Sequence, residues 1–129
     1  MRVLVTGAGG FIGAAVAEHL AEKGFDVLLH RGRADGRVEV PREAGAVVNA
    51  AGRLASGTVT EREAEEANAE LPESLGRSCA EVGIPLVHLS TPGVCGLTAG
   101  SREDSPISPE GLYEKTKAEG ERRLRALDL

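Results

Sequence analysis

The chain has 129 residues, 41% of them hydrophobic, which is enough for one domain with a buried core and too much for an intrinsically disordered segment. Its formal net charge of −5 disfavours a nucleic acid as partner. No apolar stretch approaches the ~18–20 residues of a membrane span, and the two cysteines, Cys79 and Cys95, suit reduced thiols. We therefore expect a cytoplasmic protein that binds neither nucleic acid nor membrane.

Short apolar runs alternate with helical periodicity along the chain. Five strands are expected, at residues 2–5, 25–30, 37–40, 46–52 and 84–90. Three helices are expected: residues 12–23, ended by a left-handed Gly24; a long helix from Thr60 to residue 82, which kinks or restarts at Pro72; and a last helix capped by Ser108.

Apolar strands separated by helices predict the fold class. The pattern indicates an α/β fold, with one Rossmann-type domain over residues 1–129 and a doubly wound parallel sheet of about five strands. The third strand, residues 37–40, is expected to be rudimentary, because the chain around it is too short for a full crossover helix.

The first expected strand runs directly into the glycines Gly7, Gly10 and Gly13, which open the first helix. Such glycines allow a tight turn, a close approach of the backbone to a pyrophosphate, and close packing of helix on sheet. The helix N-terminus adds amide donors and a partial positive charge. This context favours a phosphate-binding loop, including Phe11 and Ile12, over a tight turn that binds nothing.

Arginines follow the second expected strand, where dinucleotide-binding folds distinguish their cofactors. An acid at this position binds ribose hydroxyls and favours NAD, whereas an arginine accommodates a 2′-phosphate and favours NADP. Arg31 lies 18 positions past Gly13, and Arg33 follows two positions later. The planar guanidinium fork suits phosphate. We expect NADP, with NAD as the alternative cofactor and an exposed, solvated arginine pair as the alternative interpretation.

The one tyrosine of the chain, Tyr113, lies four residues before Lys117, so the two share a helix face. A lysine ammonium near a phenol lowers the pKa of the phenol and makes it a plausible general acid or base. Ser90 and Thr91, at the carboxyl end of the last expected strand, offer a hydroxyl to polarise a carbonyl oxygen. The alternative is an ordinary solvated helix face.

Together these motifs resemble the extended short-chain dehydrogenase/reductase superfamily, in its branch of NAD(P)-dependent sugar epimerases, dehydratases and reductases. "TGAGGFIG" is similar to the family's TGxxGxxG motif, and "VVNAAG" resembles the strand-four segment beside the cofactor. "ANAELPESLGRSCAEVGIPLVHLST" resembles the Asn-bearing helix and next strand of dTDP-4-dehydrorhamnose reductase-like members, and "YEKTKAEGE" resembles the YxxxKxxxE helix.

The resemblance implies a role for each matching residue. Tyr113 would be the catalytic acid or base, Lys117 would bind the nicotinamide ribose, and Thr91, with Ser90 as the alternative, would hold the reacting oxygen. Asn68 matches the helix asparagine, with a structural role as likely as a functional one. The segment beside the cofactor would be Ala50, Ala51 and Gly52.

The implied activity is NADP(H)-dependent hydride transfer to or from a carbonyl or alcohol carbon, with a nucleotide sugar as candidate substrate and a homodimer as candidate assembly. A non-catalytic NAD(P)-binding module, as a sensor or partner subunit, is the alternative. Family members continue past the Tyr/Lys helix with a substrate-binding part, so we expect a shortened member that lacks most of it. Pro92 and Gly93 stand where dehydratases carry acids, and Cys95 replaces the usual tyrosine of Val-Tyr-Gly.

Overall fold

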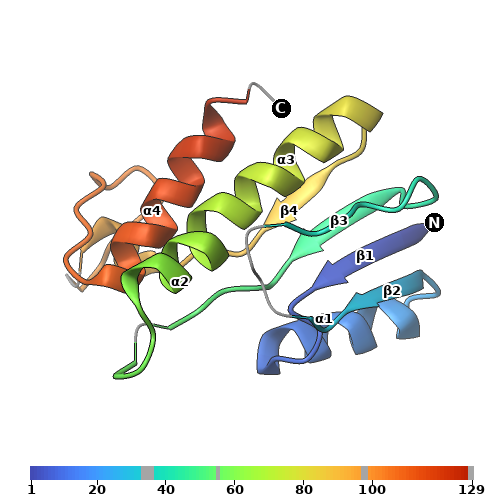
Figure 1. Ribbon diagram of the computed structural model, residues 1–129, viewed down its shortest axis with the longest axis horizontal. Helices are drawn as coiled ribbons and strands as arrows, with labels where there is room; N and C mark the ends of the chain where they lie inside the picture. Colours follow the sequence, from blue (N-terminus) through green and yellow to red (C-terminus); the bar gives the residue numbers. More distant parts are fainter. Residues whose placement is uncertain (33–36, 55, 97–98, 128–129) are drawn as a thin grey trace.

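The computed structural model describes residues 1–32, 37–54, 56–96 and 99–127 (Figure 1). The strands of this part are β1 (Arg2–Thr6), β2 (Asp26–His30), β3 (Ala46–Asn49) and β4 (Leu86–His88). The helices are α1 (Phe11–Glu22), α2 (Glu61–Glu65), the π-helix η1 (Glu66–Glu70), α3 (Leu71–Val82), the 3-10 helix η2 (Pro92–Cys95) and α4 (Leu112–Arg125).

The four strands form one parallel sheet in the order β2-β1-β3-β4. In this register Thr6 lies beside both His30 and Asn49, and Asn49 lies beside His88. The carboxyl ends of all four strands therefore meet at one edge, which is where open parallel sheets bind their ligands. The predicted α/β class and parallel sheet are confirmed.

The prediction of a strand at residues 37–40 is wrong. These residues form no strand, and β3 pairs directly with β1. Val38 and Val40 instead pack from the connecting loop onto the core. The alternation of apolar residues in this segment therefore reflects burial of single side chains rather than pairing in the sheet.

Helices cover both faces of the sheet (Figure 1). On one face, Val3 and Val5 pack against Ala17 of α1. On the other face, Leu4 and Val47 pack against the buried face of α3, which contains Leu71, Leu75 and Cys79. Successive strand residues point to opposite faces, so the continuous apolar β1 supplies both cores.

Helix α1 ends where the sequence predicts. Gly24 has a φ of +84°, and its N–H donates to the carbonyl of Ala21, while Phe25 N–H donates to that of Leu20. These two bonds satisfy the last carbonyls of the helix and direct the chain into β2.

The long central helix begins at a reciprocal capping box between Thr60 and Glu63. The disturbance expected at Pro72 is found one turn earlier, as the π-helix η1. Pro72 has no N–H to give to the carbonyl of Asn68, and that carbonyl lies against α4, where a Cβ at Gly120 would approach it to 2.2 Å. The π-helix η1 thus lies just before the proline, and α4 packs against it at the carbonyl of Asn68.

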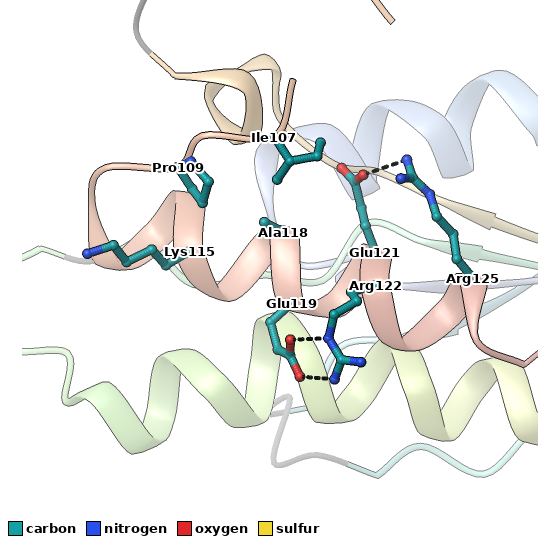
Figure 2. A pocket seen from close by; sticks show the side chains of 8 residues that line it. All are labelled: Ile107, Pro109, Lys115, Ala118, Glu119, Glu121, Arg122 and Arg125. Carbon is teal, nitrogen blue, oxygen red and sulfur yellow. Dashed lines mark hydrogen bonds and ion pairs between the residues drawn. The ribbon is translucent and has the colours of Figure 1, made fainter. Parts of the chain in front are cut away.

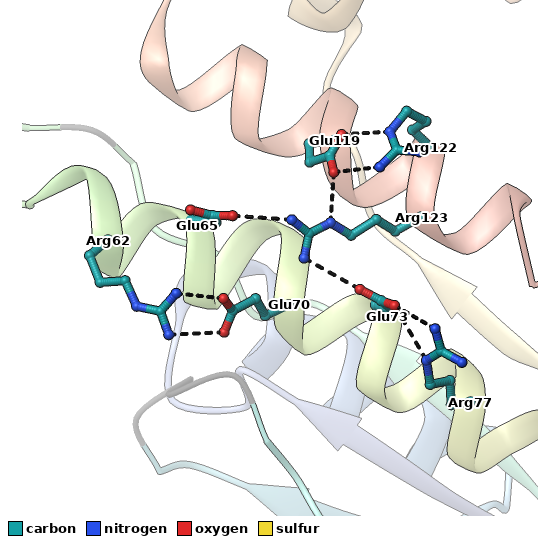
Figure 3. Close-up of polar contacts among 8 residues, drawn as sticks. All are labelled: Arg62, Glu65, Glu70, Glu73, Arg77, Glu119, Arg122 and Arg123. Atoms are coloured by element: carbon teal, nitrogen blue, oxygen red, sulfur yellow. Dashed lines mark hydrogen bonds and ion pairs between the residues drawn. The ribbon is translucent and has the colours of Figure 1, made fainter.

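Helix α4 lies against this central helix (Figure 3). Arg123 of α4 donates to Glu65 of α2, to Glu73 of α3 and to Glu119 of its own helix. Helix α4 starts at Leu112 with Gly111 as its N-cap. The prediction that Ser108 caps this helix is therefore wrong. The N–H of Ser108 donates instead to the carbonyl of Val94, which holds the preceding loop against η2.

Among the helices of the described residues, none has the length and apolar content that a membrane crossing requires.

Candidate cofactor-binding and active site

A cleft of about 430 Å³ opens where the carboxyl edge of the sheet meets α1 and α4. Its walls come from the start of α1, the loop after β3, the end of β4 and one face of α4. The lining residues are Gly10, Phe11, Ile12, Gly13, Ala50, Ala51, Gly52, Leu54, Leu89, Ser90, Tyr113 and Lys117. The fold thus brings together most of the candidate residues that the sequence predicts for a cofactor and for catalysis.

The glycine loop after β1 is a cradle that larger residues would fill. Gly7 has a φ of +66°, and a Cβ there would lie 2.7 Å from the backbone of Ala50 and Ala51. A Cβ at Gly13 would lie 2.1 Å from the carbonyl oxygen of Gly7. Gly10 caps α1 without a side-chain hydrogen bond, and the first residues of the helix line the cleft, where a helix N-terminus carries a partial positive charge. This arrangement fits a pyrophosphate.

Arg31 lies directly beside this loop, at the end of β2. The N–H of Ala8 donates to the carbonyl of His30 over 3.1 Å, which ties the loop to the strand. A Cβ at Gly9 would lie 3.9 Å from the Cβ of Arg31, whose side chain is exposed. Arg31 therefore starts next to the phosphate cradle without being part of the cleft wall as described. Arg33 lies outside the described residues.

Lys117 is buried, with 3% of its surface exposed, and is no solvated surface lysine. Its Nζ donates to the carbonyl of Leu89 and lies 3.4 Å from Nε2 of His88. Burial lowers the pKa of Lys117 to about 8, against the opposing effect of the Glu121 carboxylate.

Tyr113 is half-buried one turn before Lys117 and lines the same cleft. Burial, followed by the negative charge of Glu114, raises the pKa of its phenol. The lowering by Lys117 that the sequence predicts is not found. The Lys117 amine instead donates to the carbonyl of Leu89 and lies 3.4 Å from Nε2 of His88. The phenol is therefore protonated at neutral pH.

The two candidate hydroxyls after β4 differ in their surroundings. Ser90 lines the cleft, and its Oγ donates to Oε1 of Glu121. Thr91 caps η2, and its Oγ1 accepts from the N–H of Gly93 over 3.3 Å. Of the two, only Ser90 is among the described residues that line the cleft.

Asn68 is fully buried in η1, behind the cleft. Its Oδ1 accepts from the N–H of Arg53 over 2.8 Å, and its Nδ2 donates to the carbonyl of Arg53 over 2.9 Å and to Oγ1 of Thr116 over 3.0 Å. Asn68 thereby joins the loop after β3 to α4. It positions two walls of the cleft relative to each other.

A polar chain beneath the cleft was not anticipated from the sequence. Thr6 Oγ1 donates to Oδ1 of Asn49 over 2.6 Å, and Nδ2 of Asn49 lies 3.1 Å from Nδ1 of His88. His88 in turn reaches Lys117. Burial, and then the positive charge of Lys117, lower the pKa of His88 to about 4, so its imidazole is neutral at pH 7. The sequence feature that could have indicated this chain is the polar residue at the end of each apolar strand.

A second cavity, of about 460 Å³, lies on the outer face of α4 (Figure 2). Two charged pairs within α4 line it, Glu119 with Arg122 and Glu121 with Arg125. Ile107 and Pro109 from the preceding loop form part of its apolar wall. None of the described residues that line it belongs to the cleft wall.

Residues 1–128 match the family model described as the RmlD substrate binding domain. A dTDP-4-dehydrorhamnose reductase of Mycobacterium tuberculosis (strain CDC 1551 / Oshkosh) is 32% identical over 142 residues, covering 97% of this chain and 46% of that protein. The methionine adenosyltransferase 2 subunit beta of Xenopus tropicalis is 33% identical over 141 residues, covering 95% of this chain and 42% of that protein.

Among solved structures, a dTDP-4-dehydrorhamnose reductase of Clostridium acetobutylicum superposes with a TM-score of 0.83 at 27% identity, over 98% of this chain and 50% of that one. The chain therefore spans about half the length of the relatives that it matches.

Proposed function

The chain belongs to the RmlD substrate binding domain family, and on that basis we propose that it binds NADP(H) and carries the catalytic groups of a short-chain dehydrogenase/reductase-type carbonyl reductase. One observation carries the proposal. A single cleft joins the glycine cradle at the start of α1 to Tyr113 and Lys117 of α4. A dinucleotide needs both ends of such a cleft, a phosphate site at one and a reactive site at the other.

Each wall of the cleft has a part in this proposal. The amides at the start of α1 bind the pyrophosphate, and the exposed guanidinium of Arg31 binds the 2′-phosphate. Ala50, Ala51 and Gly52 present a small surface for the cofactor to lie on. The Lys117 amine donates to the nicotinamide ribose.

The end of the cleft lined by Ser90, Tyr113 and Lys117 is the site of proton transfer to the reacting oxygen. The bound cofactor supplies or accepts hydride at the carbon of the reacting group. Tyr113 gives its phenolic proton to the oxygen, a direction that suits its raised pKa. A hydroxyl of Ser90 or Thr91 holds that oxygen, and Ser90 is the better placed because it lines the cleft.

The substrate proposed is a nucleotide sugar with a keto group. It follows from the name of the Mycobacterium relative, a dTDP-4-dehydrorhamnose reductase, and from the fit of the same motifs in this chain.

A fluorescence titration with NADPH and NADH tests the proposed cofactor. We expect saturable binding of NADPH, and Arg31→Asp should weaken NADPH binding at least tenfold while changing NADH binding about twofold or less, since only NADPH carries the phosphate. Arg42→Asp, at an exposed arginine in the loop before β3, is the matched control and should affect neither. Equal losses for both cofactors would reject the role of Arg31, and no saturable binding would reject the cofactor site.

A second candidate is a module that binds NAD(P) without turnover, as a subunit of another enzyme. The name of the Xenopus relative, methionine adenosyltransferase 2 subunit beta, favours it. Such a module would bind NADPH with the affinity expected of the reductase. It would show no turnover for Tyr113→Phe to abolish, so the substitution would leave its binding of NADPH unchanged. A homodimer and a cytoplasmic location remain predictions for either candidate.

A further inference from the structure

The hydrogen bonds around Asn49 fix which nitrogen of His88 carries the proton. Oδ1 of Asn49 accepts from Thr6 Oγ1 and from the N–H of Ala51, the latter over 3.2 Å, so the other amide atom must be the donor Nδ2. Nδ2 lies 3.1 Å from Nδ1 of His88, which must therefore be unprotonated. A neutral imidazole in this position carries its proton on Nε2.

Nε2 is the nitrogen that faces Lys117, at 3.4 Å. An ammonium there would set two donors against each other, whereas a neutral amine has a lone pair to accept the Nε2–H. We propose that His88 is a positioning residue for Lys117, fixed by Asn49 as the Nε2–H tautomer and donating that N–H to the lone pair of the Lys117 amine.

This arrangement accounts for every bond of the amine in its neutral form, which predominates above the Lys117 pKa of about 8. A neutral amine has one lone pair and two N–H groups. The lone pair accepts from His88, and one N–H donates to the carbonyl of Leu89. One N–H then remains for the cleft that Lys117 lines. The inference thus rests on the proposed function for its consequence, because that N–H is the one offered to a ribose hydroxyl.

Other groups near Lys117 do not replace His88 in this role. Burial, opposed by Glu121, already lowers the pKa of Lys117 to about 8, and a facing N–H donor acts in the same direction as burial. Four carboxylates on the helices packed against α4 are paired with arginines. They are Glu65 and Glu73, paired with Arg123, and Glu66 and Glu70, paired with Arg62; η2 contributes Cys95, whose thiol contacts the carbonyl of Ser105.

Nuclear magnetic resonance on the whole chain tests the tautomer without any cofactor. The chain has three histidines, His19, His30 and His88, so the ring nitrogens can be assigned by substitution. We expect unprotonated Nδ1 and protonated Nε2 in His88 from pH 6 to pH 9. A protonated Nδ1 over this range would overturn the inference, whatever any variant shows.

The same protein allows the titration of Lys117 to be followed, since Lys23 and Lys115 are its only other lysines. His88→Leu should raise the pKa of Lys117 by about 0.5–1 unit, the equivalent of one hydrogen bond. His19→Leu, at an exposed histidine of α1, is the control and should leave it unchanged. A purely structural His88 would affect stability but leave the titration of Lys117 in place, and that result would also overturn the inference.

The two claims fail separately. If NADPH does not bind but the tautomer and the lysine titration are as expected, the proposed function falls while the coupling of His88 to Lys117 stands. If NADPH binds and Nδ1 of His88 is protonated, only the role of His88 falls.

Discussion

At the scale of single residues, the cleft depends on burial of groups that would otherwise be charged or solvated. Lys117 is the clearest case, because its burial lowers its pKa to about 8 and directs its amine to the end of β4. Tyr113 responds in the opposite direction, with a raised pKa, because burial penalises the charged form of each group. The two side chains therefore enter the cleft as a protonated phenol and an amine whose charged form is destabilised by burial.

Tyr113→Phe removes the proposed proton donor and little else, because the ring and its packing stay. For the reduction of a dTDP-4-keto sugar by NADPH we expect kcat to fall at least about 100-fold, the usual contribution of a general acid. The Kd for NADPH should change less than about threefold. Absorbance at the NADPH band measures the first and fluorescence the second. An unchanged kcat would support a binding module instead of a reductase.

The sequence was informative about most lining residues because each belongs to a motif with a known spacing, as for Gly13 and Lys117. It was less informative about Ser90 and Thr91, since neighbours at the end of a strand point to different sides and a shift of one residue exchanges them. It did not single out Asn49 and His88. A polar residue that ends an apolar strand resembles an ordinary strand end until the register places the two side by side.

At the scale of elements, α4 carries Tyr113 and Lys117, the side chains that we propose as catalytic, and packs mainly on other helices. Its position therefore depends on Gly120, which lies against the carbonyl of Asn68, and on Arg123, which contacts three carboxylates (Figure 3). The hydrogen bonds of Arg122 and Arg123 lower the pKa of Glu119 to about 2.

Arg123→Met keeps the aliphatic stem and removes the ion pairs. We expect the free energy of unfolding at pH 7 to fall by about 1 kcal/mol, since partly exposed pairs contribute ~0.2–1 kcal/mol each. The pKa of Glu119 is lowered by folding, so its contribution is present above about pH 4.5 and is lost as the pH falls toward 2. Urea unfolding at pH 7 and pH 3 measures the free energy of unfolding of the variant and of the unaltered chain.

The difference between the Arg123→Met variant and the unaltered chain should shrink at the lower pH. Arg77→Met, which removes only an exposed pair with Glu73 on α3, is the control and should cost less. A difference that stays constant with pH would mean that Arg123 acts through packing of its stem.

The elements themselves were largely predictable, and their exceptions have physical causes. Residues 37–40 alternate like a strand, yet they pack two valines from a loop, because the chain is too short there to return as a crossover. Pro72 was expected to kink or restart the central helix. A π turn precedes the proline, and in this turn the carbonyl of Asn68 lies against Gly120 of α4.

At the scale of the whole molecule, the parallel order of the sheet determines where chemistry can occur. All four strands end at one edge, and the cleft lies where α1 and α4 meet that edge. The class of fold followed from the alternation of strands and helices, whereas the placement of α4 over the end of β4 required the long-range contacts that only the structure provides. The second cavity, on the outer face of α4, offers an alternative ligand site that must be distinguished from the cleft.

The central claim is that NADPH binds in the cleft between α1 and α4. Titration of the ¹⁵N-labelled chain with NADPH, followed by its amide resonances, tests it directly. We predict the largest shifts at Phe11, Ile12 and Gly13, together with shifts at Ala51 and Lys117. Shifts confined to the cavity around Ile107, Ala118 and Arg122, or no shifts at saturating NADPH, would contradict the claim.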